Sequence, residues 1–172
     1  MTRIGFGVAL LLGLLAYGCG RSNYDSIDPT TVVSGDGAEF TLRLAGDDVG
    51  DFTSAKMQIQ SVQVTGGGAL LANAVQTPEV ELADVGRAHL LATFKVPAGL
   101  DEVEFSVGFA RGTLTSAKGM FDVDGRCETL RLAGKVTRIA ERKHAVIHLD
   151  VARSFVPGNG GLTLVPHFRL VY

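Results

Sequence analysis

HAVIHLDV, residues 144–151, is the stretch of sequence that decides the fold. Its inward positions recur at every second residue: Ala145, Ile147, Leu149 and Val151. Successive side chains of a β-strand point to opposite faces, so this period of two predicts a strand with one buried face. The positions between them include two histidines and an aspartate, which indicates that the other face meets water or a polar surface.

The same alternation recurs along the chain in both directions. It predicts strands over 38–44, 55–65 and 103–109, and it continues from 162 to the C-terminus. Shorter strands are predicted around 80–82 and 120–124. Within 55–65 the apolar parity changes at Gln60 and Ser61, which predicts a β-bulge at these two residues. Turns or loops rich in Gly, Asp or Pro separate the runs, at 46–51, 66–68, 97–99 and 157–161.

Helical periodicity is weak throughout the chain. One helical turn is expected within 84–91, where Gly86 opposes a longer helix. Many short strands separated by Gly-rich turns are typical of two packed sheets. The predicted fold class is therefore all-β, an antiparallel β-sandwich with at most one short helical turn.

Charge and cysteine content narrow the possible partners. The chain carries 16 Lys and Arg against 18 Asp and Glu, and a balance so close to neutral argues against a nucleic-acid partner. Of the two cysteines, Cys127 alone lies beyond the first nineteen residues, so the body of the protein cannot form an internal disulfide. Cys127 is expected to be a buried small side chain, the alternative being an exposed thiol that pairs between molecules.

The N-terminal residues predict where in the cell the protein is located. Arg3 precedes an uncharged apolar run over 4–15 that is too short to span a bilayer, which is the order of a secretory signal peptide. Residues 16–19, Ala-Tyr-Gly-Cys, resemble the lipobox of bacterial lipoproteins. That resemblance implies a signal peptide over 1–18, lipid attached to Cys19 as a membrane anchor, and, with Gly20 following, an outer-membrane location in the cell envelope. The alternative is an ordinary cleaved signal with an incidental cysteine.

Domain organisation follows from the composition beyond Cys19. Residues 19–37 are rich in Ser, Asp, Thr and Gly, which predicts a flexible tether. Residues 38–172 form the predicted β-sandwich domain. Three stretches of it, GAEFTLRLAGDDVGDFTSAKMQIQSVQV, VELADVGRAHLLATFKVPAGLDEVEFSVG and HAVIHLDVARSFVPGNGGLTLVPHFRLVY, resemble a family of bacterial lipoprotein domains of unknown function, the one numbered forty-three eighty-two. The resemblance implies a sandwich of prealbumin-like or carbohydrate-module-like type and no established activity.

Three groups of polar residues could bind a metal. Asp47, Asp48 and Asp51 crowd one loop and could begin a calcium site, although turn chemistry explains them more simply. The run 122–125, Asp-Val-Asp-Gly, starts like a calcium loop without its later ligands. His148 and Asp150 share a strand face with His144, and would need donors from a neighbouring strand. The alternative for Asp150 is a hydrogen bond to a turn or to residue 153.

The sequence predicts a non-catalytic domain. It lacks a Gly-x-Ser-x-Gly elbow, a His-Glu-x-x-His pair and a phosphate loop, so we expect neither catalysis nor a cofactor. Two classes stay open. One is a lipid-anchored structural or protein-interaction domain of the envelope, and the other is a glycan- or calcium-binding module on the same anchor. With no Trp in the chain, an aromatic platform for sugars is not expected.

Overall fold

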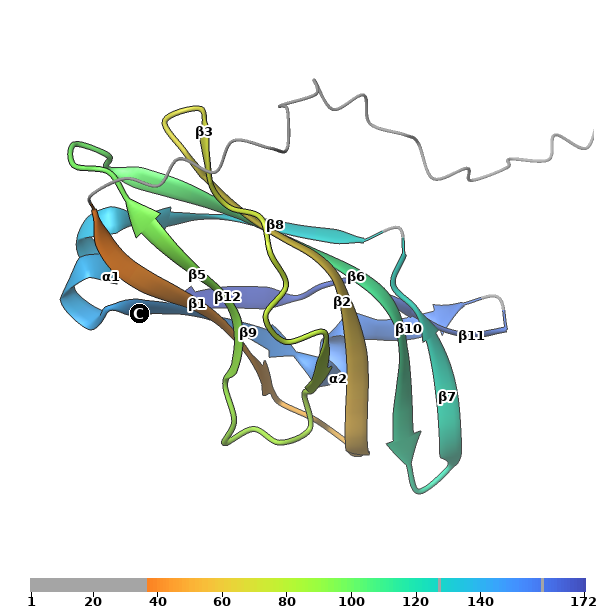
Figure 1. Ribbon diagram of the computed structural model, residues 1–172. Helices are drawn as coiled ribbons and strands as arrows, with labels where there is room; N and C mark the ends of the chain where they lie inside the picture. The colour runs from red at the N-terminus through yellow and green to blue at the C-terminus, as the bar shows by residue number, and fades with distance from the viewer. Residues whose placement is uncertain (1–36, 127, 159) are drawn as a thin grey trace, which may run out of the picture.

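A computed structural model describes residues 37–126, 128–158 and 160–172, and Figure 1 shows them as two β-sheets packed on one another. The predicted signal peptide, Cys19, nearly all of the predicted tether and Cys127 lie outside the described residues. In chain order the elements are β1 (Ala38–Asp47), β2 (Phe52–Gly66), β3 (Ala69–Ala72), β4 (Glu79–Glu81), β5 (His89–Val96), β6 (Glu102–Ser116), β7 (Gly119–Asp124), β8 (Thr129–Lys135), α1 (Val136–Arg142), β9 (His144–Asp150), α2 (Val151–Ser154), β10 (Phe155–Gly158), β11 (Gly161–Leu164) and β12 (Phe168–Val171).

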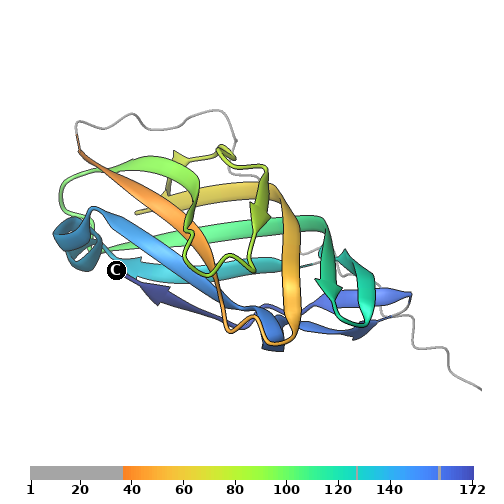
Figure 2. The ribbon, with the colours of Figure 1, turned by 90° about the horizontal axis from the view of Figure 1, so that it is seen from below.

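The smaller sheet has four strands in the order β12-β9-β1-β5. Its two central strands are far apart in the sequence, because β1 pairs in parallel with β9, with Leu44 opposite Ile147. Figure 2 shows this directly, with orange β1 beside blue β9. On its other side β1 pairs antiparallel with β5, and the register shifts where Leu42 faces Ala92 and Arg43 faces Leu90. Leu91 is therefore an extra, bulged residue of β5.

The larger sheet has eight strands, ordered β10-β11-β7-β6-β2-β3, with β4 also paired to β2 and β8 also paired to β6. Its longest contact is the antiparallel pair of β2 with β6. Between Ile59 and Ser61 the β2 strand advances two residues while β6 advances one, from Phe109 to Gly108. The bulge predicted at Gln60 and Ser61 is thus confirmed.

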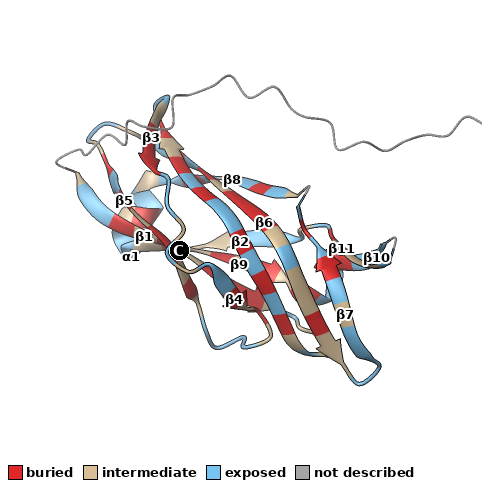
Figure 3. Ribbon diagram, turned by 45° about the vertical axis from the view of Figure 1, so that its right-hand side comes forward, coloured by how far each residue is buried: buried red, intermediate tan, exposed pale blue. Residues whose placement is uncertain are grey.

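Alternating burial along the strands builds the core between the sheets (Figure 3). In β9, residues 145, 147 and 149 are buried while their neighbours are partly exposed. An aromatic cluster joins the layers: the Phe94 ring of the small sheet lies 5.9 Å from Phe40 and 5.7 Å from Phe105 of the large sheet, between ring centroids. The all-β sandwich predicted from the alternation is therefore confirmed.

Several details of the prediction were wrong. The sandwich is not wholly antiparallel, because β1–β9 and β7–β11 are parallel pairs. Residues 84–91 hold no helical turn, and their last three residues instead begin β5. The run from 162 onward is split into β11 and β12, which belong to different sheets, and the expected loop over 157–161 is largely the β10–β11 hairpin.

Two short helices stand where at most one helical turn was expected, both elsewhere in the chain. α1 buries Ile139 under the end of the sandwich and stops at Lys143, whose φ of 66° is left-handed although it is not glycine. α2 begins at Asp150, whose carboxylate accepts a hydrogen bond of 2.9 Å from the Arg153 N–H. The predicted alternative for Asp150, a hydrogen bond to residue 153, is confirmed.

Candidate functional site

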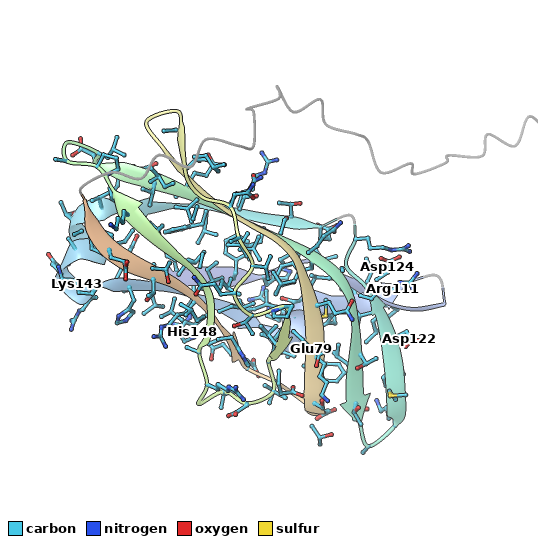
Figure 4. All side chains as sticks on the ribbon, in the orientation of Figure 1. Glu79, Arg111, Asp122, Asp124, Lys143 and His148 are labelled. Atoms are coloured by element: carbon cyan, nitrogen blue, oxygen red, sulfur yellow. The ribbon has the colours of Figure 1, made fainter. Side chains whose placement is uncertain are left out.

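The best candidate site is a cleft of about 640 Å³ on the outer face of the large sheet, which we call the polar cleft. Strands β4, β2, β6, β7 and β11 and the β10–β11 hairpin contribute to it. It is lined by Lys56, Gln58, Glu79, Arg111, Gly112, Thr113, Asp122, Val123, Asp124, Arg126, Gly158, Gly160, Gly161, Leu162 and Thr163. Figure 4 shows Arg111, Asp122 and Asp124 gathered at the β6–β7 end of the sheet.

Strand register places these side chains side by side. In one row Lys56 lies opposite Thr113, which lies opposite Asp122. In the next row Arg111 lies opposite Asp124, which lies opposite Thr163. The intervening residues of β2, β6 and β7 have the opposite parity and turn toward the core. The core alternation therefore collects hydrogen-bonding groups from four strands on one outer surface.

The β10–β11 hairpin forms one wall of the polar cleft, and glycine lets it approach closely. A Cβ built on Gly161 would come within 2.5 Å of the Asp122 carbonyl oxygen, nearer than real side chains allow. Gly160, at the turn, has a φ of +88°, a conformation that favours glycine. Both residues let β11 lie against β7 and close that side of the cleft.

Six charged side chains line the polar cleft: Asp124 and Arg126 form an ion pair, and the other four form none with a described residue. Arg126 donates to both carboxylate oxygens of Asp124, at 3.0 and 2.7 Å, and this pair lowers the pKa of Asp124. Within the described part of the chain, no ion pair or side-chain hydrogen bond is formed by Lys56, Glu79, Arg111 or Asp122. Arg111 acts on Asp124 only at longer range, where its charge adds a small lowering of the pKa. Lys56 lies opposite Glu81 on β4, and its charge helps to lower the pKa of Glu81.

A hydrogen-bond network holds β4 against β2 at the edge of the polar cleft. The Glu81 carboxylate accepts bonds of 2.6 Å from the Ser54 hydroxyl, 2.6 Å from the Ala55 N–H and 3.1 Å from the Ala83 N–H. Burial alone raises the pKa of Glu81, but these hydrogen bonds outweigh it and hold the pKa below its usual value. The buried ring of His89 adds a contact of 3.0 Å to the Glu81 carbonyl oxygen.

Of the three aspartates that could begin a calcium site, two make other contacts in the structure. Asp47 belongs to β1 rather than to the loop, and its Oδ2 accepts bonds from Arg169 Nη2 at 2.6 Å and Nε at 3.2 Å, which lower the pKa of Asp47. The Asp48 carbonyl accepts from the Ala152 N–H at 2.8 Å. Across residues 37–126, 128–158 and 160–172, no three His, Cys, Asp or Glu residues lie close enough together to bind a metal ion, so Asp51 belongs to no such group.

The histidine face of β9 likewise forms no metal group in the described residues. His148 Nδ1 is buried without a hydrogen-bond partner there and lies 3.9 Å from Asp47 Oδ2. Lys143 stands farther along the same sheet, with its Nζ 5.7 Å from the centre of the Phe40 ring. Figure 4 shows His148 and Lys143 well away from the polar cleft, so these residues are not part of it.

A second hollow of about 710 Å³ lies beneath the β6–β7 hairpin. Its walls include the aromatic rings of Phe52 and Phe121 together with Leu162. Phe52 also packs edge-to-face against Phe155, at 6.4 Å between ring centroids. This hollow offers fewer hydrogen-bonding side chains than the polar cleft, which remains the stronger candidate.

Neither helix in the described part of the chain has the length and apolar character needed to cross a membrane. Comparisons with models of protein families, with curated proteins and with solved structures found no match to this chain. The resemblance to a lipoprotein domain family therefore stays a prediction.

Sequence reasoning missed the polar cleft as a site. It had singled out Asp122 and Asp124, but only as the start of a calcium loop. It gave no role to Lys56, Glu79 or Arg111, each of which reads as one more polar residue on a solvated strand face. The available signal was the pairing of polar positions on adjacent strands, and it becomes visible only once the strand order is known.

Proposed function

We propose that this protein is a lipid-anchored, non-catalytic module of the bacterial cell envelope that binds a glycan in the polar cleft. The single observation that carries the proposal is the polar cleft itself, a concave surface on which charged and hydroxyl side chains converge and four of the charged groups form no ion pair with a described residue. Small-ligand sites are concave and use a few well-placed polar groups to fix the orientation of the ligand. Hydroxyl-rich ligands use both the donors and the acceptors that such a lining offers.

The non-catalytic part of the proposal rests on the chemistry of the lining. Thr113 and Thr163 supply hydroxyls, but the described lining holds no His to act as a general base toward them and no Cys to act as a nucleophile itself. Of its three carboxylates, Asp124 is held by Arg126, and the other two, Glu79 and Asp122, come from opposite sides of the cleft with the strands β2 and β6 between them. We therefore assign them to ligand binding.

A glycan array probed with the full-length protein, purified from membranes in detergent, tests the binding function. A double variant, Glu79→Ala with Asp122→Ala, removes two acceptors and is expected to lose the array signal. Glu104→Ala is the matched control, because Glu104 is an exposed carboxylate on β6 outside the polar cleft. If the wild type shows no glycan signal, or if the double variant keeps it unchanged, the proposed function is wrong.

The anchor has its own test. Lipid on Cys19 with several acyl chains would hold the protein firmly in a membrane. Cys19→Ser should then move the protein from the detergent phase to the aqueous phase in a partition assay, while leaving glycan binding intact. Continued partition of the variant with the membranes would contradict lipid attachment at this residue.

A second candidate function is protein interaction through a sheet edge. Among the described strands, β12 pairs only with β9, and its Phe168 side chain is 40% exposed. An edge strand with free backbone groups can accept a strand from another protein. Crosslinking in native membranes, with a photoreactive residue at 168, would support this function if it captured one envelope protein reproducibly.

A further inference from the structure

We infer that the polar cleft selects glycans that carry a carboxylate, and that the Arg111 guanidinium is the group that recognises it. This inference rests on the proposed function and names the ligand class of the same site. It depends on the order of charges across the sheet, on the absence of a close partner for Arg111, and on the absence of aromatic side chains from the described lining.

The charges have a fixed order across the strands. Glu79 on β4 and Asp122 on β7 stand at the sides, while Lys56 on β2 and Arg111 on β6 stand between them. Lys56 lies opposite Thr113, two residues from Arg111, so the two cations are diagonal neighbours about 7–8 Å apart at their backbones. A ligand that matches this order has its negative charge in the middle and donors on both sides.

The Arg111 guanidinium has no close carboxylate partner, because the carboxylate directly across from it is already bound by another arginine. Asp124, directly opposite, is held by Arg126 through both oxygens. Arg111 makes no ion pair or side-chain hydrogen bond with any described residue. A planar guanidinium in that state offers two parallel N–H groups, which match a carboxylate bidentately.

Glu79 and Asp122 suit the flanking hydroxyls of a sugar. Ionised carboxylates only accept hydrogen bonds, and sugar hydroxyls supply donors. Neighbouring strands lie about 4.8 Å apart, so the three steps from β4 to β7 span roughly 14 Å. Glu79 lies opposite Gln58, two residues along β2 from the row of Lys56, Thr113 and Asp122, so the two carboxylates stand roughly 16 Å apart at the backbone. That span accommodates a short oligosaccharide whose central unit places its carboxylate over Arg111.

A neutral glycan fits this surface less well. Sugar rings without charge gain much of their affinity by packing on aromatic rings, and none of the described lining residues is aromatic. Binding must then come from hydrogen bonds and charge. An extended peptide fits less well too. The floor is the face of a sheet whose backbone groups already pair between strands, and the only large apolar side chains of the described lining are Val123 and Leu162.

Isothermal titration calorimetry on the full-length protein in detergent, at about 0.05 M salt, tests the inference. The acidic probes are a galacturonic acid oligomer and a sialylated lactose, and the neutral probes are the galacturonic acid methyl ester oligomer and lactose. A glutamate-rich peptide is included as an acidic ligand that is not a sugar. We expect at least one acidic glycan to bind about tenfold or more tightly than its neutral counterpart.

Arg111→Gln should weaken binding of that acidic glycan about tenfold and leave the weaker neutral binding unchanged. Arg111→Lys keeps the charge without the fork and should give an intermediate affinity. Arg87→Gln is the matched control, an exposed arginine outside the polar cleft, and should change nothing. Thermal unfolding of each variant checks that the substitutions at these exposed positions leave the fold intact.

The outcomes separate the two proposals. Equal binding of acidic and neutral glycans, or an Arg111→Gln variant with unchanged affinity, overturns the inference about acidic ligands and leaves glycan binding standing. No binding of any glycan overturns both. Tighter binding of the acidic peptide than of every glycan overturns the glycan assignment and makes the polar cleft a peptide site.

Discussion

Phe94→Ala tests whether the aromatic cluster between the sheets stabilises the domain. The Phe94 side chain is 2% exposed and lies within 6 Å of two other rings, as centroid distances of 5.9 and 5.7 Å show. Removing a buried Phe side chain costs about 3–5 kcal/mol, because transfer energy is lost and a cavity remains. Small domains have only about 5–15 kcal/mol of total stability. We therefore expect the variant to lose a large share of it.

Thermal unfolding followed by circular dichroism converts that free energy into a temperature. For a folded body of this size, an unfolding entropy of about 2.1 cal/mol/K per residue makes 1 kcal/mol worth about 3.5 °C. Phe94→Ala should lower the Tm by about 10–18 °C. Phe94→Leu keeps most of the volume and loses the ring contacts, so a loss of about 1–2 kcal/mol is expected.

Phe168→Ala is the matched control, because this phenylalanine is 40% exposed on the edge strand β12. Its loss should cost about 1 kcal/mol or less. The reasoning is refuted if Phe94→Ala and Phe168→Ala have the same Tm. It is also refuted if Phe94→Ala costs under about 1.5 kcal/mol, since the cluster would then not be the contact that joins the two sheets.

Three further predictions concern single residues. The pKa of Glu81 in the folded protein lies below its ordinary 4.5, so the ionised carboxylate stabilises the fold above about pH 4.5, and this contribution declines as the pH falls through the folded pKa. The difference in urea midpoint between wild type and Glu81→Gln should therefore shrink from about pH 6 to pH 3. Gly46→Ala should cost about 1–3 kcal/mol in urea unfolding, because its Cβ would overlap a backbone carbonyl, whereas Gly86→Ala, with its nearest contact at 3.7 Å, should be neutral or slightly stabilising. Asp150→Ala removes the cap of α2 and should cost about 1 kcal/mol by thermal unfolding, while Asp150→Asn, which keeps an acceptor, should cost less; equal losses would argue against capping.

The strands that the sequence predicted best are those whose alternation is unbroken. β9 and the first half of β6 bury every second residue, and β2 does so on both sides of its predicted bulge. β5 was missed because the bulge at Leu91 brings two buried residues together, Leu91 and Ala92, and the alternation is lost between His89 and Phe94. A phase change within a short strand removes the signal that periodicity depends on.

α1 was missed for a different reason. Its apolar residues Val136, Ile139 and Ala140 have helical spacing, but seven residues are too few to separate that pattern from the end of β8. The helix stops at Lys143 in a left-handed conformation, where the sequence has no glycine to mark a C-terminus. The local sequence therefore marked neither the start nor the end of α1.

The polar cleft could not be predicted from spacing along the chain. Its residues come from β2, β4, β6, β7 and β11, and the parallel contact of β11 with β7 crosses a long connection. Within any one of these strands, the polar residues are those expected of a face exposed to solvent. Only the lateral order of the strands makes neighbours of Lys56, Arg111 and Asp122.

The parallel pair of β1 with β9 has a consequence for biosynthesis. β1 finds its parallel partner only when residues near Ile147 have been translated, and β12 must follow to complete that sheet. Such distant pairings make folding slow. The small sheet of a nascent chain thus stays incomplete until β12 has emerged, and an incompletely folded chain is the form that a secretory leader such as the proposed one can pass through a translocation channel.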